Sequence, residues 1–238
     1  MKHVKLVLSV LILAGILFLA SCSDDNSVKP KEDDVNGNIE VTDTAAVFLI
    51  QSSYVALVEQ SEPIESSILK AWLKENGEFV APEFAKCNGE NMVEFGGSKG
   101  QYQYSTPYYA PDFNVEIGGY LGGTLAFTAS HNRIIRFTNI TAGDTIRKNN
   151  FKISYTGVDP NTELRVIVSS PFGSVLKRIG TTASTGTVTF AAEELARPYR
   201  EAAIVFLQDR DELSTYKNKM ILKRFSSYAC IECYIVSE

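Results

Sequence analysis

Phe151-Lys152-Ile153-Ser154-Tyr155 decides the fold of this chain, because apolar and polar side chains alternate strictly along it. This period of two is typical of a half-buried β-strand. Residues 164–168 and 188–190 repeat the pattern, and residues 202–207 and 228–236 are apolar runs of the kind found in a central strand. Turn residues rich in Gly, Pro, Asn and Asp separate these segments. The second half of the chain is therefore predicted to be an antiparallel β-sandwich.

The preceding half shows weaker strand signals. Residues 47–50 and 54–58 have the composition of strands, and residues 125–137 are predicted to form a hairpin that turns near Ser130-His131-Asn132. The best boundary between the halves is Thr141-Ala142-Gly143-Asp144, a turn-forming stretch ahead of the clear strand at 151. It divides the body into residues 45–143 and 144–238, each close to the size of one immunoglobulin-like sandwich.

Residues 61–77 fit two patterns. Ser61 can cap a helix that has Pro63 in its first turn and ends at Gly77. The alternative is a strand through Leu69-Lys70-Ala71-Trp72-Leu73 that turns at Glu75-Asn76-Gly77. We favour the strand.

The strand layout, followed by Cys87-Asn88-Gly89 and a tyrosine-rich stretch, resembles the first immunoglobulin-like domain of uncharacterised Bacteroidota surface lipoproteins. The resemblance is one of layout and spacing. It implies an all-β fold class: two tandem immunoglobulin-like antiparallel β-sandwich domains after a disordered tether.

The N-terminus has the parts of a secretory signal. Met1-Lys2-His3-Val4-Lys5 is basic, and a predominantly apolar run of 14 residues follows from Leu6 to Leu19. This run is too short to span a bilayer comfortably. Leu19-Ala20-Ser21-Cys22 resembles a bacterial lipobox, which implies that residues 1–21 are removed as a signal peptide and that Cys22 is lipidated. Two or more acyl chains give stable membrane attachment without a transmembrane helix.

Residues 22–44 are predicted to be an acidic tether. Residues 23–44 contain seven acidic and two basic side chains and almost no large apolar ones, so they cannot bury enough surface to order. Ser23-Asp24-Asp25 resembles the surface-export signal of Bacteroidota lipoproteins, which implies a lipid-anchored protein on the outer face of the outer membrane. With the acidity concentrated in the tether, the body is close to neutral, which argues against nucleic acid as a partner.

Two catalytic or metal motifs fail on their context. Gly96-Gly97-Ser98-Lys99-Gly100 matches G-x-S-x-G, with Asp112 and His131 following in the order of a hydrolase triad. The motif needs a helix after the serine, and a tyrosine- and proline-rich stretch follows instead. We interpret the segment as a loop.

Cys87, Cys230, Cys233 and His131 have the composition of a zinc set. Cys230 and Cys233 lie in an apolar run without turn residues, where residues three apart point to opposite faces of a strand. That geometry excludes a disulfide between them. We predict no metal and no cofactor.

The most interesting surface candidate is a tyrosine-rich segment within residues 101–120, because exposed aromatic rings stack on sugars and peptides. Its candidate ligand contacts are Tyr102, Tyr104, Tyr108, Tyr109, Phe113 and Tyr120. The alternative is that these rings pack onto the sandwich. Asp43-Thr44-Ala45 and Asp144-Thr145-Ile146 resemble the O-glycosylation sequon of Bacteroidota, which makes Thr44 and Thr145 candidate glycosylation sites at predicted linkers.

Two function classes remain. The first is a non-enzymatic surface module, such as an adhesin or an accessory protein that binds a glycan or a surface protein. The second is a hydrolase with an unrecognised site, although no cluster of carboxylates stands out. A pilus subunit is a further alternative, without a visible processing site.

Overall fold

The computed structural model describes residues 44–97, 99–171, 173–195 and 201–236. Within these ranges the chain is all-β, and its helical content is one short 3-10 turn at Lys148–Asn150. None of the described helical residues forms a segment long and apolar enough to cross a membrane. The predicted β class is therefore confirmed, whereas a tandem immunoglobulin-like arrangement is not.

One wide sheet carries the described part of the fold. Eight of its strands lie side by side, in the order β14 (Gly173–Gly180), β13 (Glu163–Ser170), β16 (Ala202–Tyr216), β17 (Lys219–Val236), β1 (Thr44–Ala56), β2 (Ile64–Glu75), β7 (Gln101–Thr106) and β6 (Val93–Glu94). The two short strands β11 (Thr145–Arg147) and β3 (Glu78–Phe79) pair with β17 and β2. β1 and β17 run parallel along almost the whole of β1.

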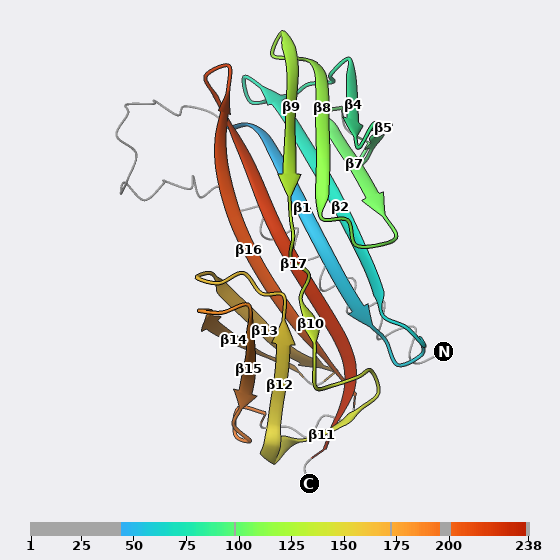
Figure 1. Cartoon of the computed structure of the whole chain (residues 1–238), viewed down its shortest axis with the longest axis vertical. Coiled ribbons are helices and arrows are strands. Elements are labelled where there is room, and N and C mark those ends of the chain that lie inside the picture. The colour runs from blue at the N-terminus through green and yellow to red at the C-terminus, as the bar shows by residue number, and fades with distance from the viewer. Residues whose placement is uncertain (1–43, 98, 172, 196–200, 237–238) are drawn as a thin grey trace. The chain divides into compact units, whose positions relative to one another are not determined.

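Two smaller sheets cover one face of the wide sheet (Figure 1). The first contains β5 (Glu90–Asn91), β4 (Phe84–Cys87), β8 (Asp112–Tyr120) and β9 (Gly123–Ser130). The second contains β10 (Arg136–Phe137), β12 (Phe151–Thr156) and β15 (Thr185–Phe190). Each small sheet encloses its own hydrophobic core against the wide sheet. We call these the first core and the second core, in the order of the two sheets.

The two cores share strands. β17 places Ile221 and Phe225 in the first core and Ala229 and Ile231 in the second. β1 likewise contributes to both. At about 3.3 Å per residue, the 18 residues of β17 extend over about 60 Å, enough to pass behind both small sheets. The cores are therefore linked by continuous backbone.

Because β1 and β17 belong to both cores, the predicted division into separate domains at residues 45–143 and 144–238 is wrong. The described residues belong to one compact unit, and Ile135, Phe137 and Ile140 lie in the second core although they precede the predicted boundary. The boundary itself is bonded to β17, because Gly143 N donates to Glu232 O and Tyr234 N donates to Asp144 O.

The predicted strand within residues 61–77 is confirmed as β2, and the helix alternative is wrong. Leu69, Ala71 and Leu73 are fully buried at a spacing of two, and the chain turns at Asn76 and Gly77, both with positive φ. Such a turn favours Asn and Gly because they tolerate the left-handed region.

The predicted hairpin over residues 125–137 is wrong. β9 ends at Ser130 and pairs with β8, whereas β10 pairs with β12 in the other small sheet. Residues 131–135 are therefore a crossing segment from one small sheet to the other. The two predicted strands at 47–50 and 54–58 are one continuous strand, β1.

Candidate functional site

A row of polar side chains separates the two cores. Thr106, Ser67, Ser52, Ser227 and Gln208 lie in register across five neighbouring strands and point to the side of the small sheets. All five are at least 94% buried. They occupy positions where the strands otherwise place apolar residues, so the sheet changes from apolar to polar at this level.

The polar row holds two irregular segments, the loop between β7 and β8 and the crossing segment at residues 131–135. Thr106 Oγ1 donates to Tyr108 O at 2.7 Å, and Ala110 N donates to Ser67 Oγ at 2.8 Å. Ser52 Oγ donates to Arg133 O at 2.7 Å. Irregular backbone carries polar groups that must find partners when buried, and the hydroxyls supply them. This requirement explains why the row is polar.

His131 lies against the polar row, beside Ser52 and Ser227, and is 7% exposed. Its Nε2 is 3.1 Å from the Ser226 carbonyl, 3.1 Å from Ser52 Oγ and 3.2 Å from Ser227 Oγ. A carbonyl can only accept, so Nε2 carries the proton and donates to Ser226 O. Burial lowers the pKa of His131 from 6.5 to about 4, so the ring is neutral at pH 7.

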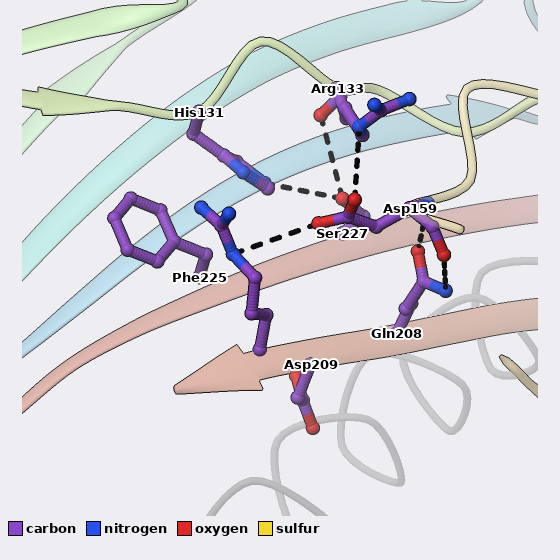
Figure 2. A pocket seen from close by; sticks show the side chains of 8 residues that line it. His131, Arg133, Asp159, Gln208, Asp209, Phe225 and Ser227 are labelled. Atoms are coloured by element: carbon purple, nitrogen blue, oxygen red, sulfur yellow. Dashed lines mark hydrogen bonds and ion pairs between the residues drawn. The ribbon is translucent and has the colours of Figure 1, made fainter. Parts of the chain in front are cut away.

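A small hollow opens beside His131 and is lined by charged side chains (Figure 2). Asp159 receives two cations, with Arg133 Nε at 3.3 Å and Arg210 Nε at 3.6 Å. The Arg210 guanidinium also lies 4.6 Å from the ring centroid of Phe225. Gln208 bonds the backbone of Asp159 from β16, through its Nε2 at 2.9 Å from Asp159 O.

The outer rim of the hollow is also paired. Asp209 forms an ion pair with Arg165 and accepts a hydrogen bond from Ser226 Oγ at 2.7 Å. Every charged side chain that lines the hollow thus has a partner of opposite charge.

This geometry does not support catalysis by a serine nucleophile. Ser52 Oγ donates to Arg133 O, and His131 Nε2 already carries its proton, so the imidazole cannot accept the serine proton through that atom. The cavity volume is about 10 Å³, roughly the room that one water molecule needs and far below the roughly 300–1,000 Å³ of small-molecule sites. We interpret the hollow as a structural contact between the crossing segment, the turn at Asp159 and the strands β16 and β17.

We expect acid to weaken the fold through His131. The unfolded chain protonates this residue below a pKa of about 6.5, whereas the folded chain resists protonation down to about 4. Stability should therefore fall as pH drops from about 6.5 to about 4, by up to about 3 kcal/mol from this group. The ring is surrounded by Arg133 and Arg210, which oppose its protonation, and by Asp159, which favours it.

The check is urea unfolding across this pH range in the wild type and in His131→Gln, which retains a donor for Ser226 O. The free energy of unfolding should depend less steeply on pH in the variant, because the contribution of His131 is gone. The carboxylates contribute equally in both proteins. Identical slopes would show that His131 is not held neutral by burial.

The tyrosine-rich segment divides into surface and core residues. Tyr108 is 61% exposed, whereas Tyr102, Tyr104 and Tyr109 are half-buried. Tyr102 and Tyr104 pack against the first core from β7. The Tyr109 hydroxyl donates to His131 O at 2.8 Å, which ties the loop after β7 to the crossing segment.

Phe113 and Tyr120 are buried in the first core, so the prediction that they contact a ligand is wrong. Phe113 points inward from β8, where apolar residues alternate with exposed ones as far as Ile117, and Tyr120 points inward after a register shift between Ile117 and Tyr120. The Tyr120 hydroxyl donates to the backbone carbonyls of Ala45 and Lys74, and burial raises its pKa to about 12.

The cysteines lie apart. Cys87 is in the first core and Cys233 is in the second. Cys230 points to the opposite face of β17 from Cys233, as predicted, and all three thiols are free. Burial raises the pKa of each thiol to about 12, so they are unreactive. His131 bonds serines and a carbonyl instead, so the structure does not bring the zinc set together.

The remaining predicted sites are placed as follows. Gly96, Gly97 and Gly100 lie in the turn between β6 and β7 with positive φ, which agrees with a loop and not with a nucleophile elbow; Ser98 lies outside the described residues. Asp112 accepts from Ser130 Oγ at 2.7 Å. Cys22, Ser23, Asp24 and Asp25 also lie outside the described residues.

Thr44 and Thr145 begin β1 and β11, so their predicted placement in linkers is wrong. Thr44 is half-buried and Thr145 is exposed. Glycosylation at either residue stays a prediction.

Comparisons with known proteins show no family for this chain. No family model and no curated protein matches the sequence. A solved structure from work on host cell surface retention of a 1.5-MDa bacterial ice-binding adhesin is 15% identical, and the match covers 82% of this chain and 67% of that one. Its TM-score is 0.24, which is too low to support an argument about function.

Proposed function

We propose that this chain is a lipoprotein anchored in the outer membrane and exposed at the cell surface, where it acts as a non-enzymatic binding or assembly module. The lipobox-like Leu19-Ala20-Ser21-Cys22 and the acidic residues after it support the anchor. The partner is a glycan or a surface protein. The paired charges and small volume of the hollow beside His131 give no support to hydrolysis at that place.

The observation that carries the binding role is the way Tyr108 is presented. Tyr108 is 61% exposed, yet three hydrogen bonds hold the loop that carries it. Thr106 Oγ1 bonds the Tyr108 carbonyl, Ser67 Oγ bonds Ala110 N, and the Tyr109 hydroxyl bonds the crossing segment. A loop whose backbone is held in place loses less entropy on binding, which is how binding loops on β-scaffolds gain affinity.

Tyr108→Ala is expected to weaken binding by about two- to twelvefold, the equivalent of roughly 0.5–1.5 kcal/mol for one stacked ring. The melting temperature should stay nearly unchanged because the ring is mostly in solvent.

Tyr109→Phe is expected to cost about 1 kcal/mol of stability, because it removes the hydrogen bond to His131 O.

The measurement uses an array of host and microbial glycans together with cross-linking pull-down on intact cells. Leu176→Ala is the matched control, since Leu176 is 52% exposed on β14 at the far end of the wide sheet. A large loss of stability in Tyr108→Ala would show that the ring is structural. An array without hits and a pull-down without partners would refute the binding function.

A further inference from the structure

The wide sheet has a second face, turned away from both cores, which we call the outer face. On β2, Leu69, Ala71 and Leu73 point into the first core, so Lys70, Trp72 and Lys74 point to the outer face. Two glutamines of β7 extend this group sideways. Gln101 pairs in register with Trp72, and Gln103 pairs with Lys70.

Aromatic rings complete the surface. Phe95 packs edge-to-face on Trp72, with ring centroids 5.6 Å apart and an interplanar angle of 87°. Its backbone N donates to Gln101 O, which places it next to β7. Val93 pairs with Gln103 and is 70% exposed. The half-buried Trp72 thus lies among apolar and amide side chains on the outer face.

The lysines and glutamines of this surface have no ion-pair or side-chain hydrogen-bond partner among the described residues. Lys70 Nζ lies 5.5 Å from the ring centroid of Phe95, and Lys74 Nζ lies 5.1 Å from that of Phe79, but neither lysine has a carboxylate partner there. The side-chain amides of Gln101 and Gln103 likewise have no hydrogen-bond partner in the described ranges. In contrast, Arg224 on the same face is paired with Asp211.

We infer that this part of the outer face, formed by Lys70, Trp72, Lys74, Gln101, Gln103 and Phe95, is a binding site for an acidic saccharide. The indole can stack on the C–H face of a sugar ring, the two amides can bond its hydroxyls, and the two ammonium groups match carboxylates on the sugars. The inference rests on the proposed binding function but uses different residues from Tyr108.

Other anions fit this surface less well. An acidic peptide added as a strand would need a free sheet edge, whereas these residues lie on the face of the sheet. Charge alone would account for the lysines but would leave the aromatic pair and the two amides without a role.

Trp72 supplies the readout, because it is the single tryptophan of the chain. We expect tetragalacturonic acid to change its fluorescence saturably and to bind about tenfold more tightly than the methyl-esterified tetramer, since the ester lacks the charges that two partly exposed ion pairs require. The preference should shrink as salt is raised.

The double variant Lys70→Gln/Lys74→Gln should lose the preference for the acid while binding the ester as the wild type does. Lys86→Gln is the matched control, because Lys86 Nζ lies 5.4 Å from the ring centroid of Phe84 on the first small sheet, in a similar cation–π arrangement. Melting temperatures establish that all variants are folded.

Three results would overturn the site: no change in Trp72 fluorescence, equal affinity for acid and ester, or equally tight binding of a pentaglutamate peptide. The proposed function is separable from this outcome. Suppose that the protein binds a glycan on the array, that Tyr108→Ala weakens this binding and that Lys70→Gln/Lys74→Gln leaves it intact. That result would uphold the proposed binding module and overturn the outer-face site.

Discussion

Replacing Phe206 by alanine is expected to lower the urea midpoint of the unfolding transition reported by Trp72, although the two residues serve different cores. Phe206 is fully buried in the second core, with ring centroids 5.0 Å from Phe137 and 5.4 Å from Tyr155. Truncating such a ring costs about 3–5 kcal/mol through lost contacts and the cavity that remains. Trp72 lies on β2, whose inward residues belong to the first core.

The effect should reach Trp72 because β1 and β17 pass through both cores without a break. Fluorescence and far-UV circular dichroism should therefore report one coincident transition in the variant, as expected of a single cooperative unit. Leu213→Ala on the same strand is the control, because Leu213 is 54% exposed and its loss should cost less than about 0.5 kcal/mol. A Trp72 transition that stays unchanged in Phe206→Ala would mean that the two cores unfold independently.

Local sequence patterns predicted the strands well where one face is buried and the other is solvated. β12 and β13 lie where the alternation at residues 151–155 and 164–168 placed them. The same rule explains the error at Phe113, whereas Tyr120 faces inward after a register shift between Ile117 and Tyr120 that the alternation does not indicate. Phe113, Val115 and Ile117 alternate with exposed residues in β8, so the period itself marks Phe113 as inward-facing, although its aromatic ring drew attention to it as a surface residue.

The far half of β16 could not be predicted from its own residues. Its segment from Asp209 to Tyr216 is largely polar, and it is extended because β17 pairs with it along its whole length. Asp211 bonds Arg224, and Glu212 bonds Lys223, across the two strands. The paired residues are 13 and 11 positions apart across the hairpin turn at Lys217-Asn218, so the strand is indicated by its pairing with β17 and not by the polar pattern of β16 alone.

The same limit applies to the domain boundary and to the hollow. Turn-forming residues at 141–144 predicted a linker, but they carry no information on which core the last strand would complete. His131 stood out as an isolated histidine, whereas Arg133, Asp159, Gln208 and Arg210 meet beside it from separate segments. The available signal was the serine at an inward position of β1, Ser52, between apolar Ile50 and Tyr54.

Replacing Cys22 by alanine is expected to abolish the membrane attachment of this protein. Each buried methylene of an acyl chain contributes about 0.8 kcal/mol, so two chains hold a protein stably in a bilayer and their loss leaves nothing of comparable strength. The variant should be released or should accumulate as an unprocessed precursor. Asp24→Ala/Asp25→Ala is the companion variant, which should keep the lipid but lose exposure at the cell surface.

Metabolic labelling with palmitate tests the anchor most directly, in cells that produce the wild type, Cys22→Ala or the control Ser23→Ala. Lipidation at Cys22 predicts label in the wild type and in Ser23→Ala, with none in Cys22→Ala. Equal incorporation of palmitate by Cys22→Ala would contradict the lipid anchor, and with it the proposal that this β-sheet protein is a module held at the cell surface by its N-terminus.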